Sequence, residues 1–375
     1  MLNIDFINSN YLGTHSPGYV IDILRENNFY EYVIGNKSNY TNEKSLTSDT
    51  LYDIASLTKT FTATLVFMAY EDGLFDLNDF VFAIDSRFYN LKNVRILDLL
   101  CHRVEIWTEG YLGSAKTNAE FYSILFSSYV KSNTRKYIDV HYIILSTLLE
   151  KVYSKSYDKI VIEKIKNPLG LNSLSFDPDT INIASTNFEY KENGDVVNDI
   201  KLGEIHDTKA RIAKKLGIFT GHASIFINGH DLLKFLKSFF DCSLLKKETI
   251  KIMLSHDDVN KINYNYLKSI VSENEINVMY KEFIKIKPFF SLPKTYNYMS
   301  CRYKNAIFAE NDIPMSASPN SITFSGYTGP MFLIDFDRKI IIVVMCNVTN
   351  NNILFRKDRK DKTTEIVDKI YQQII

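Results

Sequence analysis

A serine and a lysine three positions apart carry the clearest chemical signal in this chain of 375 residues. Ser56 and Lys59 lie in the segment Asp53–Thr60 (DIASLTKT), at the start of a run through Asp72 whose apolar residues have helical spacing. Residues i and i+3 share one face of a helix, so the lysine amine can reach the serine hydroxyl. Because a hydroxyl is a weak nucleophile without an adjacent base, the spacing predicts Ser56 as nucleophile and Lys59 as its activating partner.

A serine at the first turn of a helix has two further advantages and one ordinary explanation. The helix dipole favours negative charge there, and the backbone N–H of Ser56 is free to join an oxyanion hole. The ordinary explanation is that Ser56 only caps the helix and that Lys59 is solvated. The short motif alone does not separate these two interpretations, so its context in the chain decides between them.

Several further segments follow in an order that is more specific than any single motif. They are Glu71–Val81 (EDGLFDLNDFV), Ile96–His102 (ILDLLCH), Asn167–Leu171 (NPLGL), Gly203–Asp207 (GEIHD), Gly221–Phe226 (GHASIF) and Phe324–Gly329 (FSGYTG). With Asp53–Thr60, they make the sequence resemble the serine β-lactamase and penicillin-binding protein family, in its class C-like and esterase branch. The resemblance extends over about residues 17–350 and is poor at 245–300.

The resemblance assigns roles to a small set of residues. Ser56 matches the nucleophile, and Lys59 the lysine of the first motif. Tyr137, in Tyr137-Ile138-Asp139, matches the phenolic base of the second motif, and a neighbouring Lys⁺ should favour its phenolate. Asp139 would position the substrate or Lys59. The alternative for Tyr137 is that it is one of 24 tyrosines and simply packs at a helix start.

The third motif of the family implies a wall for the substrate. It corresponds to Phe324, Ser325 and Gly326, and the backbone N–H of Tyr327 would supply the second oxyanion donor. We expect residues 325–327 to form an edge strand beside Ser56 and Tyr137, where the sheet meets the helical part of the chain.

Two departures from the family pattern concern substrate binding. Phe324 stands where the family has Lys, His or another polar residue, and His102-Arg103-Val104-Glu105 replaces the usual H-T-S-G. A substrate carboxylate against Phe324 would lose water without gaining a partner, whereas a neutral acyl group would gain apolar contact. We therefore expect neutral acyl substrates to be preferred, unless Arg103 supplies a positive charge.

Strand patterns at both ends of the chain flank a mainly helical middle. Residues 18–25 and 29–35 form a predicted hairpin, and residues 322–325, 331–335 and 340–347 form three further predicted strands, followed by an amphipathic helix at 363–375. The prediction is an α/β fold of the β-lactamase/transpeptidase type, with one antiparallel sheet built from both termini and flanked by helices. Residues 1–84 and 215–375 would form the sheet subdomain, and residues 85–214 a mainly helical one.

Composition and residue spacing limit which classes of binding partner are expected. Lys+Arg and Asp+Glu both number 44, so there is no basic surplus of the kind that nucleic-acid binding requires. His206 and His222 lack metal-ligand spacing and are expected to form hydrogen bonds within a buried loop, so neither a metal nor another cofactor is predicted. The longest apolar run, Ile340–Cys346, is too short for a membrane span. Widely spaced cysteines and a start without a signal-peptide pattern favour a cytoplasmic protein.

These observations converge on a serine hydrolase that works through an acyl-enzyme. Its substrate would be a small-molecule or peptide-like ester, amide or lactam, as in an esterase, a D-amino-peptidase such as a D-alanyl-D-alanine carboxypeptidase, or a β-lactamase. The alternative is a catalytically weak penicillin-binding or ligand-binding protein of the same fold, because both departures alter the binding surface. The presence of Ser56, Lys59 and Tyr137 together favours the hydrolase. The sequence carries no signal for an oligomeric state.

Overall fold

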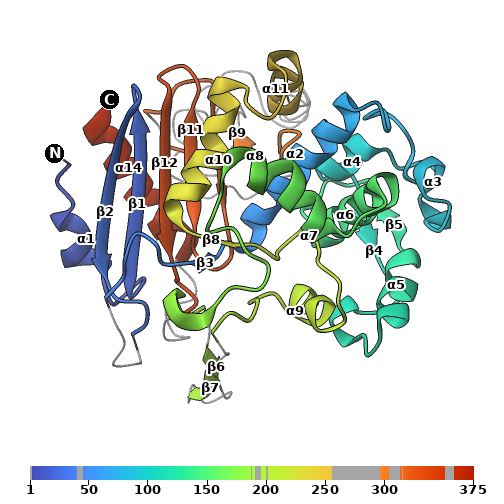
Figure 1. The fold of residues 1–375 in the computed structure, drawn as a ribbon, viewed down its shortest axis with the longest axis horizontal. Coiled ribbons are helices and arrows are strands. Elements are labelled where there is room, and N and C mark those ends of the chain that lie inside the picture. The colour runs from blue at the N-terminus through green and yellow to red at the C-terminus, as the bar shows by residue number, and fades with distance from the viewer. Residues whose placement is uncertain are drawn as a thin grey trace, which may run out of the picture.

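The computed structural model describes residues 2–39, 45–186, 188–190, 196–199, 202–255, 296–303, 313–314, 316–350 and 359–375. Its centre is a six-stranded antiparallel sheet in the order β2-β1-β12-β11-β10-β9 (Figure 1). These strands are β1 (Gly18–Arg25), β2 (Asn28–Gly35), β9 (Arg302–Tyr303), β10 (Ser321–Ser325), β11 (Met331–Asp335) and β12 (Ile340–Cys346). The N-terminal hairpin therefore joins the C-terminal strands through β1, which pairs with β12 so that Tyr19 lies opposite Cys346.

Local sequence explains the N-terminal hairpin. Glu26 and Asn27 connect β1 to β2 with φ of 51° and 69°, which is the two-residue loop of a type I′ turn. Its backbone twist matches that of the strands, and Arg25 pairs directly with Asn28.

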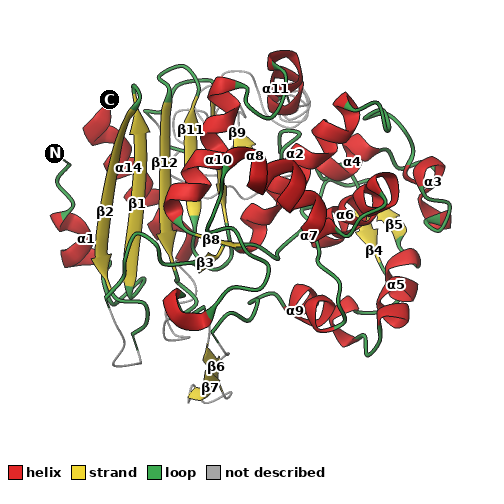
Figure 2. Cartoon of the chain, in the orientation of Figure 1, coloured by secondary structure: helices red, strands yellow, loops and turns green. Residues whose placement is uncertain are grey.

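Each face of the sheet is covered by helices (Figure 2). On one face, α14 (Arg359–Ile374) and α1 (Asp5–Asn10) pack on alternate strand residues such as Tyr19, Ile21 and Ile23. On the other face, α10 (Gly229–Asp241) packs on Val20 and Leu24 and joins the large core that continues into the helical half of the molecule. The period-two alternation of β1 thus divides the protein into two apolar layers.

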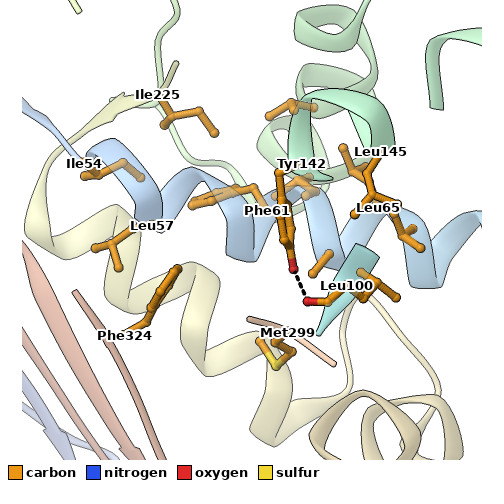
Figure 3. Close-up of a cluster of buried hydrophobic side chains, with 14 of the residues drawn as sticks. Ile54, Leu57, Phe61, Leu65, Leu100, Tyr142, Leu145, Ile225, Met299 and Phe324 are labelled. Atoms are coloured by element: carbon orange, nitrogen blue, oxygen red, sulfur yellow. Dashed lines mark hydrogen bonds between the residues drawn. The ribbon is translucent and has the colours of Figure 1, made fainter. Parts of the chain in front are cut away.

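The helix that begins just after Ser56 is buried on every side. In α2 (Thr58–Glu71), every residue from Thr58 to Ala69 is buried. This helix lies between the half of the molecule that contains the sheet and α6 (Asp139–Tyr153). In Figure 3, Phe61 of α2 lies beside Tyr142 of α6, whose hydroxyl donates to the Leu100 carbonyl at 2.9 Å. A helix enclosed in this way holds its first turn in a fixed position.

The remaining elements complete the described part of the chain. They are β3 (Tyr52–Asp53), η1 (Ala55–Leu57), α3 (Val81–Ile84), η2 (Tyr89–Leu91), α4 (Ile96–Leu100), β4 (Glu105–Trp107), η3 (Leu112–Ser114), α5 (Asn118–Phe126), β5 (Tyr129–Ser132), α7 (Tyr157–Val161), η4 (Ile162–Lys166), α8 (Asn167–Leu169), η5 (Thr180–Asn182), β6 (Phe188–Tyr190), β7 (Val196–Asp199), α9 (Thr208–Lys215), β8 (Phe226–Ile227) and α11 (Lys247–Leu254). Among the described helices, none is long and apolar enough to cross a membrane.

The expected α/β fold, with an antiparallel sheet from both termini and flanking helices, is confirmed. One detail was wrong: residues 325–327 do not form a strand, because β10 ends at Ser325, and the short edge strand β9 pairs with β10 only at Ile322 and Thr323. The short hairpin β4–β5 and helix α11 also had no recognised sequence pattern. The division at residues 85 and 214 stays a prediction, since α2 from the first segment packs against α6 from the second.

Candidate active site

Ser56 lies in a single turn, η1, that links strand β3 to helix α2. The turn is strained, because Ala55 has φ of 45°, a conformation that costs a non-glycine residue on the order of 1 kcal/mol or more. The buried Asp53 side chain holds it: Oδ1 accepts the Ala55 N–H at 2.8 Å, and Oδ2 accepts the His206 N–H at 2.7 Å. The GEIHD segment therefore helps to hold the serine turn through the hydrogen bond from His206 to Asp53.

Lys59 points its amine at Ser56 from a completely buried position. Its Nζ donates to Ser56 Oγ at 3.0 Å, to Asp139 Oδ1 at 2.9 Å and to the His222 carbonyl at 3.3 Å. An ammonium has three protons to donate, and these three acceptors use them all. This geometry contradicts the ordinary explanation of a solvated lysine beside a capping serine.

Tyr137 completes a cluster with Ser56 and Lys59. Both residues act on its phenol to lower the pKa, and the Lys59 Nζ lies 4.8 Å from its ring centroid. The ring packs against His102 and Tyr296, with centroids 4.6 Å and 5.4 Å away. The structure thus brings the serine, the lysine and the phenol together, as the sequence predicts.

The protonation states differ from our expectation. Burial acts to lower the pKa of Lys59, but Asp139 and Tyr137 outweigh it, so this pKa lies above its ordinary value. Burial raises the pKa of Tyr137 and outweighs the opposing effect of Lys59. Lys59 does favour the phenolate, as expected, but burial has the larger effect on the pKa of Tyr137. The resting site holds a charged lysine and a neutral phenol.

A second lysine, absent from the sequence prediction, lies on the other side of Asp139. Lys209 Nζ is 3.1 Å from Asp139 Oδ2 and 2.9 Å from Asp207 Oδ2. The other oxygen of Asp207 meets His222 Nε2 at 2.9 Å, so His222 does form a hydrogen bond within its buried loop. Despite burial, the charges of Lys59, His222 and Lys209 hold the pKa of Asp139 well below its usual range.

This cluster also contains the one described group with metal-ligand geometry. Ligand atoms of Asp139, Asp207 and His222 lie within 4.8 Å of one another. The Lys209 ammonium contacts both carboxylates, so the arrangement already includes a cation.

The end of β10 packs against the serine turn. A Cβ on Gly326 would lie only 2.5 Å from the Ile54 carbonyl oxygen, and Thr328 Oγ1 donates to the Asp53 carbonyl at 2.6 Å. Ser325 is half-buried, and the Tyr327 side chain is 62% exposed and stacks on His206. Glycine is required at residue 326 because the two backbones touch there.

Phe324 belongs to the core more than to the surface. It is buried in the cluster that contains Leu57, as Figure 3 shows, and its ring centroid lies 6.4 Å from that of Tyr137. Arg103 meets Asp98 at 3.2 Å, so an acidic neighbour offsets its charge. Position 324 thus carries an aromatic ring and no charge, while the Arg302 guanidinium is buried against the Tyr296 ring, 4.6 Å from its centroid.

His102, at the start of the departing segment, is an interior residue. Its Nδ1 lies 2.7 Å from His141 Nδ1, and its Nε2 lies 2.8 Å from Ser300 Oγ. Burial holds the pKa of both imidazoles far below the ordinary value. The neutral His102 ring packs against Tyr137, and His141 contacts His102 in turn.

The fold and this arrangement define the class of the protein as β-lactamase/transpeptidase-like. A family model described as Beta-lactamase matches residues 10–363, and the chain belongs to that family.

Individual relatives are distant. A putative D-alanyl-D-alanine carboxypeptidase of Escherichia coli O157:H7 is 25% identical over 243 residues, which are 55% of this chain and 56% of that protein. The chain thus matches about half the length of this relative. The octameric penicillin-binding protein homologue of Pyrococcus abyssi has a TM-score of 0.68 at 19% identity, covering 98% of this chain and 76% of that one. A class C beta-lactamase of Rhodobacter sphaeroides has a TM-score of 0.66 at 14% identity, covering 99% of both. The two structures share the fold.

Proposed function

We propose that this protein is a serine hydrolase that forms an acyl-enzyme at Ser56. The observation that carries the proposal is the completely buried Lys59 amine, 3.0 Å from Ser56 Oγ and fixed by Asp139. A buried lysine and a strained turn at Ala55 do not stabilise the folded protein. Buried charges and strained backbone are instead concentrated at catalytic and binding sites.

The proposed reaction begins with loss of the Ser56 proton to the Lys59–Tyr137 pair, once that pair has a deprotonated member. Ser56 Oγ then attacks the substrate carbonyl, and the backbone N–H groups of Ser56 and Tyr327 stabilise the oxyanion. When the tetrahedral intermediate collapses, the pair returns the proton to the leaving group. Water then attacks the acyl-enzyme by the same proton route and releases the acid.

The substrate that fits best is a small-molecule or peptide-like compound with a neutral acyl group. The aromatic surroundings of Tyr137, made by Phe324 and Tyr296, favour apolar contact, and the guanidinium of Arg302, 4.6 Å from the Tyr296 ring centroid, is buried. We therefore place short-chain esters ahead of penicillins and free D-alanyl peptides, although a curated relative carries the name of a carboxypeptidase.

Covalent labelling tests the proposal. The protein is incubated with a serine-reactive fluorophosphonate and, separately, with a fluorescent penicillin, and the modified peptide is identified by mass spectrometry. We expect the fluorophosphonate on Ser56 and no labelling of the Ser56→Ala variant. Labelling that persists in Ser56→Ala would exclude Ser56 as the nucleophile. Stable acylation without ester turnover would favour the alternative of a weakly catalytic binding protein.

A further inference from the structure

Asp139 is shared between two ammonium groups. Its Oδ1 accepts from Lys59 at 2.9 Å, and its Oδ2 lies 3.1 Å from Lys209 Nζ. Lys209 comes from α9, whereas Lys59 comes from α2, so the carboxylate at the start of α6 joins two elements that are far apart in the chain. Among the described residues, Lys209 contacts Asp139 and Asp207 but not Ser56. Its effect on the serine therefore passes through Asp139.

The shared carboxylate is part of a closed ring of interactions. Lys209 continues to Asp207, and Asp207 to the imidazole of His222. The carbonyl of His222 then accepts from Lys59 at 3.3 Å. Because each member contacts the next directly, removal of one charge changes the field at all the others.

We propose that Lys209 is a positioning residue that shares Asp139 with Lys59 and thereby sets the pH range in which Ser56 is acylated. This inference rests on the proposed function. Without Lys209, the whole negative charge of Asp139 would act on Lys59 and hold its proton more tightly. With Lys209 present, the ring of Lys59, Asp139, Lys209 and Asp207 balances two cations against two anions, and Lys59 gives up its proton more readily.

The other groups around Lys59 do not supply this balance. The titratable groups that face or influence it are Tyr137, Tyr142, His102, His141, Asp139 and, through Asp139, Lys209, Asp207 and His222. Burial keeps Tyr142 a phenol, since its pKa lies well above the ordinary value, and keeps His102 neutral. Lys209 is therefore the second ammonium group in direct contact with this carboxylate among the described residues.

The test is the pH profile of Ser56 acylation, measured as the rate of fluorophosphonate labelling between about pH 5 and pH 10. In Lys209→Met, we expect the rising limb to move upward by roughly one pH unit, the scale on which a neighbouring charge acts. Lys209→Arg should return the limb to its wild-type position because it restores the charge. Lys215→Met is the matched control, since Lys215 lies on the same helix and faces Glu204 at 3.7 Å instead.

Asp139→Asn gives an independent check of sign. Loss of the carboxylate should move the limb to lower pH, opposite to Lys209→Met. An unshifted profile in Lys209→Met, or a rate lowered equally at every pH, would overturn the inference and assign Lys209 a structural role. If Lys209→Met does not fold, Lys209→Gln keeps a hydrogen-bond donor, and failure of both to fold also overturns the inference. Absence of Ser56 labelling in the wild type would instead refute the proposed function.

Discussion

At the scale of single residues, the site rests in a state that cannot yet remove a proton from Ser56. Lys59 is charged because Asp139 and Tyr137 outweigh its burial, and Tyr137 is a neutral phenol because burial outweighs the effect of Lys59. One proton must leave this pair before the serine is activated. Acylation should therefore become faster as pH rises above neutrality, until one of the two groups is largely deprotonated.

Removal of either member of the pair should slow acylation strongly. We expect Lys59→Ala and Tyr137→Phe each to lower the acylation rate by about two orders of magnitude, the usual effect of losing a positioned proton-transfer group. Tyr137→Phe keeps the ring that packs on His102 and Tyr296, so its fold should be unchanged. The measurement is stopped-flow release of p-nitrophenol. Wild-type turnover by Tyr137→Phe would mean that another base operates.

A polar residue at position 324 should change substrate preference. Phe324→His places a hydrogen-bonding group beside Tyr137, where the wild type offers an aromatic ring 6.4 Å away. We expect kcat/KM for a chromogenic cephalosporin to rise about tenfold relative to that for a p-nitrophenyl ester, which corresponds to about 1.4 kcal/mol of added binding to the carboxylate.

The reference for that comparison is the wild-type protein assayed with both substrates. Efficient cephalosporin hydrolysis by the wild type would show that a cation elsewhere already serves the carboxylate. Arg103 is a poor source because Asp98 lies 3.2 Å from its guanidinium.

At the scale of elements, the position of Ser56, the proposed nucleophile, depends on three segments that meet at η1. Strand β3 leads into it, helix α2 leaves it, and the end of β10 presses against it at Gly326. The contact with Gly326 is between backbones and has no room for a side chain, so it fixes the distance between the serine turn and the proposed oxyanion donor at Tyr327.

A single methyl group at Gly326 should therefore separate these elements. The Cβ in Gly326→Ala would lie 2.5 Å from the Ile54 carbonyl oxygen, so the end of β10 must move outward. We expect at least a tenfold loss in acylation rate, with a change in thermal unfolding that is small beside it. Gly110→Ala is a suitable control, because its Cβ meets only the flexible Ile124 side chain at 3.3 Å. Equal effects of both changes would contradict this account.

Much of the site could be predicted because its residues carry local signals. Ser56 and Lys59 lie within one helical turn, and Tyr137 and Asp139 lie at the start of a long helix, α6. Lys209 was missed because its role depends on how α9 meets α6, and no local pattern encodes that contact. The raised pKa of Tyr137 was also missed, since its burial against Tyr296 follows from packing. The sequence did show the GEIHD and GHASIF segments, which contain Asp207 and His222. It did not show that Lys209 is the partner of Asp207.

At the scale of the whole molecule, one buried acid opposes folding at high pH. Asp22 on β1 lies beneath the start of α10, so close that a Cβ on Gly229 would be 1.9 Å from its Oδ2. Neither carboxylate oxygen has a hydrogen-bond partner among the described residues. Burial, and to a lesser extent the charge of Glu31, raises the pKa of Asp22 to about 8.

The sign of the resulting pH dependence follows from this shift. The folded protein keeps the Asp22 proton up to about pH 8, whereas the unfolded chain loses it near the ordinary aspartate pKa of 3.8. The free energy of unfolding should therefore fall between these values as pH rises, by up to about 1.4 kcal/mol per pH unit from this group. Asp22→Asn removes this dependence. Urea unfolding at pH 5 and pH 8 should show the variant gaining stability relative to wild type at pH 8, and a pH-independent difference would contradict the assignment.

The pairing of β1 with β12 also has a consequence for the newly made protein during translation. Ser56 and Lys59 are synthesised early. The segment at Gly326, which packs against the serine turn, emerges much later, and so does β12, which pairs with β1 at Cys346 and Tyr19. Until then, the β1–β2 hairpin keeps an unpaired, apolar edge of the kind that chaperones protect and that otherwise aggregates. A nascent chain therefore holds Ser56 before the segment at Gly326 is present, and the proposed hydrolytic activity can arise only after Cys346 has emerged and β12 has paired with β1.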